Sequence, residues 1–513
     1  MGRFQKTGVV NERESKGRAE ALRSIALLVT SVAVAALALT NQSLWIDEAH
    51  SALKAMQPSL ASWWQVLTTE KGSDLQMPFY MLWLWAWEKM AGHSELALRA
   101  ANLPWLLLAH YFLYQAGRRS SLGPFPLLAL ASLNPFLWAY LNEARPYVMQ
   151  YAAACVLCAF LFRAAKDASF ALKPAGLWIF AGGLLLLCGS SLLGVVWAAF
   201  AGAAWLYLVR DRVRKVFQTA NIIPLAAAAV GLGVLGLFYF WTLRSGARAS
   251  GAGKTGLLNL AFVFYELTGA AGLGPGRLKI RQDGFSAFRA MGVSLLPLVA
   301  GLFLILALLA HGLVRAWKAR MRPAIGTGAI YAIPPVVLLF ALGYLQDFRV
   351  LGRHFMPVMP VILGLFLLSI SAMKRRRAVI FCTALATIWL ASSLSLRFAA
   401  RHQKDDYRSA ARLARAALAQ GASVWWSADN AAATYYGLPL GESGRSAARP
   451  IVVQSPAQLA GLPLPDLVAA SKPDLYDPAG QLAEFLRAHD FIPVRDLPAF
   501  TIWRKPAPLP GRH

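Results

Sequence analysis

Long apolar runs constrain this chain more than any other feature. About eleven of them approach the ~20 residues that an α-helix needs to cross a bilayer. We predict spanning helices at residues 24–40, 96–116, 123–141, 147–165, 174–190, 192–209, 221–242, 291–314, 325–345, 355–372 and 378–396. The chain has 57% hydrophobic and only 15% charged residues, which is more apolar than a soluble domain. The sequence therefore predicts an α-helical polytopic membrane protein.

The net charge of +26 does not indicate nucleic-acid binding, because the basic residues form short clusters between the apolar runs. The clusters are Arg118-Arg119, Arg163 with Lys166, Arg210–Lys215, Arg315–Arg322 and Lys374–Arg377. With a cytoplasmic N-terminus, every one of them falls on the cytoplasmic side, as the positive-inside rule expects. They are also suited to contact anionic membrane lipids. We expect a multi-pass protein of the bacterial inner membrane.

This topology divides the chain into three parts. Residues 1–23 form a cytoplasmic N-terminal segment, residues 24–396 the transmembrane domain with a first outer loop at 41–95, and residues 397–513 a periplasmic α/β domain. In the last part, Asp405–Gln420 and Pro478–Arg487 have the pattern of helices. Ala422–Ser427, Pro450–Gln454 and Phe500–Arg504 have the pattern of strands, and Ser245–Gly256 that of a flexible loop.

The apolar run Met77–Met90 allows two interpretations. It is short, it starts at Pro78, and a full span here would invert every later loop. We expect Pro78–Lys89 to lie in the outer interface, packed with Ser59–Thr69, and its tryptophans suit that depth. An ordinary span is the alternative.

Asp47 and Glu48 stand where the first predicted span leaves the bilayer on the outer side. A carboxylate at such a position is suited to act as a general base on a lipid-borne substrate, although a polar loop start would also contain acids. The cysteines Cys155 and Cys158 have C-x-x-C spacing, but they lie within an apolar run and indicate packing.

Other polar residues fall at the same outer level. They are Glu143, Arg145 and Tyr147, then Lys279 and Arg281, then Arg349, Arg353 and His354. Together with the two acids, they suit a substrate with an anionic head and a hydroxyl to deprotonate. The alternative is that Glu143–Arg145 and Asp347–Arg349 are ordinary interfacial ion pairs. There is no compact cluster of metal ligands, so no metal is firmly predicted, and a divalent cation remains an open alternative.

Five segments in this order resemble the GT-C membrane glycosyltransferases. They read WIDEAHS, QMPFYMLWLW, GHSELALRAANLPW, NPFLWAYLNEARPYVMQ and GRHFMPVMPVI. The nearest branch resembles the protein O-mannosyltransferases and the lipid A aminoarabinose transferase. The resemblance covers most of residues 20–400, and the tail resembles the periplasmic domain of that branch. The chain differs at Gln76-Met77-Pro78, where many relatives carry Pro-Pro or His-Pro.

The resemblance implies an inverting transfer of a hexosyl or pentosyl group from a polyprenyl-phosphate donor to an acceptor hydroxyl. It implies Asp47 as the general base and Glu48 as the group that orients acceptor or sugar. Arg145 and Arg353 are the leading candidates to bind the phosphate; Lys279, Arg281 and His354 are weaker ones. Glu143 would contact the sugar, hold Arg145, or share a divalent metal with Asp47.

A lipid or solute transporter, or a flippase for envelope polysaccharide precursors, is the alternative. Transporters place ionisable groups near the bilayer midplane, often on repeated halves. Here the predicted spans contain almost no charge and no repeat is visible, which favours the enzyme over a transporter or an assembly scaffold. The sugar and the acceptor, whether protein, lipid or polysaccharide, stay open.

Overall fold

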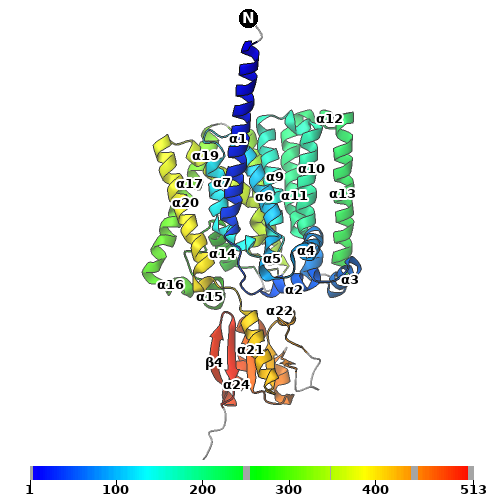
Figure 1. Cartoon of the computed structure of the whole chain (residues 1–513), viewed down its shortest axis with the longest axis vertical. Coiled ribbons are helices and arrows are strands. Elements are labelled where there is room, and N and C mark those ends of the chain that lie inside the picture. The colour runs from blue at the N-terminus through cyan, green and yellow to red at the C-terminus, as the bar shows by residue number, and fades with distance from the viewer. Residues whose placement is uncertain are drawn as a thin grey trace, which may run out of the picture.

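The chain forms a bundle of long helices with a small sheet domain at one end (Figure 1). The computed structural model describes residues 4–246, 255–319, 321–346, 348–440, 449–453 and 455–506. Helix α1 (Phe4–Ala36) runs without a break past residue 24 and extends from the far end of the bundle. The end next to the sheet domain is called the site end below.

Nine helical segments of the described residues are long and apolar enough to cross a membrane. The helices in them are α1, α5 (Glu95–Ala100) with α6 (Leu103–Gly117), α9 (Tyr147–Lys166), α11 (Leu192–Val209) with α12 (Val213–Val216), α13 (Thr219–Arg244), α17 (Leu296–Lys318), α18 (Arg322–Leu345), α19 (Met359–Ser371) and α20 (Arg375–Phe398). These segments match nine of the predicted spans. The protein is therefore a multi-pass helical membrane protein, as predicted.

The two remaining predicted spans form shorter helices. Residues 123–141 are divided into α7 (Phe125–Leu133) and α8 (Pro135–Leu141) because Pro135 has no N–H to donate. The Asn134 side chain caps α8 by accepting a hydrogen bond from the Leu137 backbone N–H at 3.0 Å. Helix α10 (Pro174–Ser190) has 17 residues and packs against α9, α11 and α13 within the bundle.

The run that starts at Met77 does not cross the bundle. Helix α4 (Pro78–Ala91) has 14 residues, too few for the ~20 of a span. It lies at the site end with α2 (Ile46–Ala55), α3 (Leu60–Glu70) and α5 (Figure 1). The Trp83 and Trp87 indole N–H groups donate to carbonyls of the α5 region, at 2.9 and 2.8 Å. The alternative of a full span is wrong.

The segment between α13 and α17 contains helices that the sequence patterns did not predict. These are α14 (Leu257–Leu267), α15 (Arg277–Asp283) and α16 (Ser286–Arg289), all at the site end (Figure 1). Most of the loop predicted at Ser245–Gly256 lies outside the described residues.

The C-terminal domain is a five-stranded mixed sheet with strand order β2-β1-β3-β5-β4. Its strands are β1 (Val424–Ser427), β2 (Ile451–Val452), β3 (Leu467–Ser471), β4 (Ile492–Leu497) and β5 (Phe500–Arg504). Its helices are α21 (Tyr407–Ala419), α22 (Asn430–Tyr435), α23 (Pro473–Tyr476) and α24 (Gln481–Ala488). Strand β1 is parallel to β2 and β3, and the pairs β3–β5 and β5–β4 are antiparallel. The predicted α/β domain is confirmed, with β3 and β4 as additions.

The sheet domain and the first loop of the bundle share one hydrophobic core. Leu44, Leu67 and Tyr80 from the loop belong to the same buried cluster as Tyr407 and Trp426 from the domain. Removing this apolar surface from water stabilises the docked arrangement. The domain is thus packed onto the site end.

Candidate active site

A cavity of about 270 Å³ lies at the site end. Its walls come from α8, α14, α15, the segment before α19, the linker after α20 and the sheet domain. Eight cationic side chains line it: Arg277, Arg281, Arg349, Arg353, Arg397, Arg401, Lys404 and Lys472. Among the described residues, three carboxylates line it: Glu143, Glu266 and Asp405. This excess of positive charge suits an anionic ligand.

Asp47 lies beside this cavity, in the first turn of α2, where the helix dipole favours an acid. Its Oδ2 atom is 3.2 Å from Nη1 of Arg353, which lines the cavity. The Asp47 side chain is 28% exposed, so it remains accessible. The Arg353 guanidinium also contacts the rings of Trp45 and Tyr147, at 5.4 and 5.8 Å from their centroids. The structure therefore brings Asp47, Arg353 and Tyr147 together, and Nη1 of Arg145 donates to the Asp47 backbone carbonyl at 3.3 Å.

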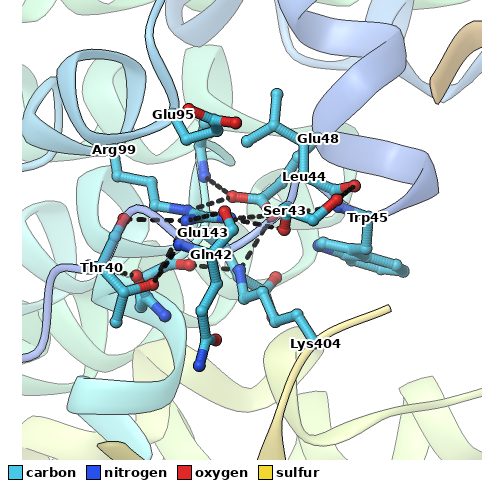
Figure 2. Close-up of polar contacts among 12 residues, drawn as sticks. Thr40, Gln42, Ser43, Leu44, Trp45, Glu48, Glu95, Arg99, Glu143 and Lys404 are labelled. Atoms are coloured by element: carbon cyan, nitrogen blue, oxygen red, sulfur yellow. Dashed lines mark hydrogen bonds and ion pairs between the residues drawn. The ribbon is translucent and has the colours of Figure 1, made fainter. Parts of the chain in front are cut away.

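Glu48 forms a completely buried ion pair with Arg99, and Lys404 joins this pair (Figure 2). Arg99 donates to both of its carboxylate oxygens at 2.9 Å, and Lys404 Nζ donates to Oε2 at 2.8 Å. The Ala144 backbone N–H donates to Oε1, also at 2.9 Å. Burial would raise the pKa of Glu48, but Arg99 and Lys404 outweigh it and lower the pKa to about 2. Both oxygens are occupied, so Glu48 joins four chain segments.

Glu143 is a cavity carboxylate with one open oxygen. Its Oε1 atom is 3.3 Å from Nη1 of Arg277, and its buried Oε2 has no hydrogen-bond partner among the described residues. Burial raises the pKa of Glu143, and Lys404 and Arg277 only partly offset this. Arg277 also pairs with Glu266 at 2.6 Å and lies over the Tyr140 ring. The Glu143–Arg145 pair considered from the sequence is not formed.

The Arg145 side chain forms hydrogen bonds with other buried side chains of the protein. Its Nη1 atom donates to Asp74 at 2.6 Å and to Ser51 at 2.7 Å, and the side chain is buried. Asp74 also accepts from Lys54 at 2.9 Å. Burial would raise the pKa of Asp74, but Arg145 and Lys54 lower it to about 2. Arg145 thus connects α2 to the segment before α4 and is not among the residues that line the cavity.

Of the remaining predicted residues, some line the cavity and others do not. Arg349 and Arg281 line the cavity, and Arg281 pairs with Asp474 of the sheet domain. His354 accepts from the Leu351 N–H at 3.2 Å and stacks on Phe348, so its ring is used locally. Lys279 is 59% exposed and pairs with Asp283 at 2.6 Å. Asp347, the suggested partner of Arg349, lies outside the described residues.

Sequence reasoning missed several charged residues at the site end. They are Asp74, Arg99, Glu266, Arg277, Lys404 and Lys472. For all of them except Arg99 and Lys472, the available signal was a place in the predicted outer loops or just after the last predicted span, which they share with the residues that were singled out. No group of three His, Cys, Asp or Glu side chains suited to a metal occurs in the described part of the chain.

Lys404 gives the cavity a predicted pH dependence. Burial and Arg99 lower the pKa of Lys404 to about 8, although Glu48 partly opposes them. As the pH rises through 8, Lys404 loses its proton and the cavity loses one positive charge, so anion affinity should fall. The Lys404→Arg variant, which does not titrate in this range, should show a flatter profile between pH 7 and 9. Binding isotherms for inorganic phosphate at four pH values would measure this, and parallel profiles for the two proteins would contradict it.

Comparison with solved structures defines the architecture as the GT-C fold with a C-terminal sheet domain. The structure of ArnT from Cupriavidus metallidurans bound to undecaprenyl phosphate matches with a TM-score of 0.51 and 14% identity, over 95% of this chain and 99% of that one. The same protein in the apo state matches with a TM-score of 0.53 and 13% identity, over 94% and 98%. No protein-family model and no curated protein matches the chain. The predicted resemblance is confirmed for the fold.

Proposed function

We propose that this protein is an inverting glycosyltransferase that moves a hexosyl or pentosyl group from a polyprenyl-phosphate donor to an acceptor hydroxyl. The observation that carries the proposal is the Asp47 carboxylate, 3.2 Å from Arg353 at the side of a cation-lined cavity. The likeness in fold to ArnT, whose structure holds undecaprenyl phosphate, supports a lipid-phosphate donor. The reaction takes place at the outer face of the bacterial inner membrane, with the N-terminus of the chain in the cytoplasm.

Two kinds of group are needed for this reaction. Asp47 accepts the proton of the acceptor hydroxyl as its oxygen attacks the anomeric carbon. The bond from this carbon to the phosphate oxygen breaks, and the electron pair leaves on the phosphate, so no carboxylic acid has to protonate the leaving group. Arginines stabilise the departing charge. Arg353, the partner of Asp47, has this role in the proposal, and Glu143 offers its open oxygen to the sugar.

The Arg353→Ala variant should bind donor about tenfold or more weakly, because a charge-assisted hydrogen bond contributes ~1.5–3 kcal/mol. Titration of purified protein with undecaprenyl phosphate would measure the change. Arg118→Ala is the matched control, since this exposed arginine pairs with Glu20, does not line the cavity and should leave the affinity unchanged. Equal affinities for the wild type and Arg353→Ala would contradict the phosphate role.

The function as a whole is tested by mass spectrometry of lipid carriers and envelope glycans from cells that lack the protein. A polyprenyl-phosphate sugar should accumulate, and the product that disappears identifies the acceptor as protein, lipid or polysaccharide. The transporter alternative is tested with purified protein in detergent, which has no second compartment. Sugar transfer in detergent would exclude transport as the explanation, and complete inactivity with the accumulated lipid would contradict the enzyme.

A further inference from the structure

The carboxyl ends of two parallel strands of the sheet domain face the cavity. Strands β1 and β3 are parallel, so their carboxyl ends lie at the same edge of the sheet. Just after β1, Asp429 pairs with His50 of α2 at 3.3 Å. Directly after β3, Lys472 lines the cavity. In open α/β sheets, ligands bind outside the carboxyl ends of parallel strands, and here this edge faces the proposed active site.

Lys472 has an unusual backbone for a lysine. Its φ of 37° lies in the left-handed region, which favours glycine. Its side chain is only 5% exposed and forms an ion pair with Asp405, which also lines the cavity. Among the non-glycine residues with positive φ in the described chain, Lys71, Lys472, Asp490 and Ala499, only Lys472 lines the cavity. Strained residues of this kind persist where the surrounding structure holds them, often at ligand sites.

The surroundings of Lys472 connect it to the proposed catalytic residues. Its ammonium lies 6.0 Å from the centroid of the Trp45 ring, and the same ring is contacted by Arg353, the partner of Asp47. Two residues after Lys472, Asp474 pairs with Arg281. Arg349, which lines the same cavity, has no hydrogen bond or ion pair among the described residues.

We propose that Lys472, together with Arg281 and Arg349, binds a phosphate group of a substrate. The three side chains are called the rim site below. Asp405 and Asp474 are the counter-ions of Lys472 and Arg281, and an arriving phosphate replaces those carboxylates. The C-terminal domain thereby completes the binding site. The inference rests on the proposed function for its substrate, which carries the phosphate on either the lipid donor or the acceptor.

The test uses the purified full-length protein in detergent and two probes, inorganic phosphate and undecaprenyl phosphate. Lys472→Gln should weaken the binding of inorganic phosphate about tenfold or more. Lys505→Gln, an exposed lysine of the same domain, is the control and should bind as the wild type does. If Lys472→Gln also weakens undecaprenyl phosphate, the rim site holds the donor; if that affinity is unchanged, the site holds a phosphate of the acceptor.

Two further variants separate ligand binding from a structural role. Both Lys472 variants remove the buried partner of Asp405, but Lys472→Gly also relieves the left-handed backbone, so its Tm should be higher than that of Lys472→Gln while both lose phosphate affinity. Asp405→Asn removes the competing carboxylate and should tighten phosphate binding several-fold. Unchanged phosphate affinity in both Lys472 variants overturns the proposal. Because these measurements need no turnover, a failure to find sugar transfer would defeat the proposed function and leave the rim site to be decided by the binding data.

Discussion

The Asp47→Asn variant should lose sugar transfer by a factor of about 10²–10⁴, the usual contribution of a positioned general base. The amide has the size of the carboxylate but cannot accept the proton of the acceptor hydroxyl. The structural cost should be small, because Asp47 is partly exposed and its side chain pairs only with Arg353 among the described residues. Membrane insertion and Tm should therefore stay close to those of the wild type.

Single-turnover transfer by purified protein would measure this prediction, with donor binding recorded separately. Asp283→Asn is the matched control, because Asp283 forms a surface pair with Lys279 and should tolerate the change. Donor affinity should be preserved in Asp47→Asn, which places the loss in the chemical step. A variant that turns over at the wild-type rate would remove Asp47 from the role of base.

The Arg99→Ala variant should be much less stable than the wild type, with a marked fall in Tm. Removing one partner of a buried ion pair typically costs about 3–5 kcal/mol, because the other charge is left buried and incompletely compensated. Arg99 is completely buried, and besides Glu48 it donates to the carbonyls of Thr40, Gln42 and Ser43 (Figure 2). Its loss would leave all of these groups short of a donor.

Thermal unfolding monitored in detergent would compare Arg99→Ala with Arg118→Ala. Arg118 forms an exposed pair with Glu20 at 3.0 Å, and such surface pairs contribute less than ~1 kcal/mol. Glu48→Gln should resemble Arg99→Ala, with less folded protein recovered, whereas Asp47→Asn should not. An Arg99→Ala protein as stable as Arg118→Ala would show that the network does not hold the site end together.

The different environments of Asp47 and Glu48 follow from helix geometry and could not be deduced from their adjacency. Successive residues of an α-helix point about 100° apart, so one carboxylate of α2 faces Arg353 and the other faces Arg99. The sequence singled out the two acids, but the rotation of α2 about its axis is fixed by packing against α3, α4 and the sheet domain. The role of Glu48 as an orienting group therefore loses its geometric basis, because both of its oxygens are occupied.

The positive-inside pattern of the loops predicted which residues would lie at the same end of the bundle, but it could not predict which of them would form ion pairs. Arg353 and Asp47 are 306 positions apart and meet because both lie at the site end. Glu143 and Arg145, although neighbours, pair with Arg277 and Asp74 from other segments. Ion-pair choice depends on side-chain direction, which a single sequence does not show.

In the sheet domain, the strands with a strong β-sequence pattern were predicted, and those with a weak pattern were missed. Strand β5 has β-branched and aromatic residues and was predicted with its bounds. Strand β4 contains Pro493 and two charges, which the structure accommodates at the sheet edge. Strand β3 is short and rich in alanine, so neither it nor the cavity position of Lys472 after it was visible in the sequence.

The most direct measurement is sugar transfer by the purified protein. The donor is the polyprenyl-phosphate sugar isolated from the membranes of cells that lack this protein. The lipid phosphate released and the sugar transferred would be quantified together, and the anomeric configuration of the product determined. We expect equimolar release and transfer with inversion by the wild type, and neither by Asp47→Asn. Retention of configuration, or transfer that does not depend on Asp47, would contradict it.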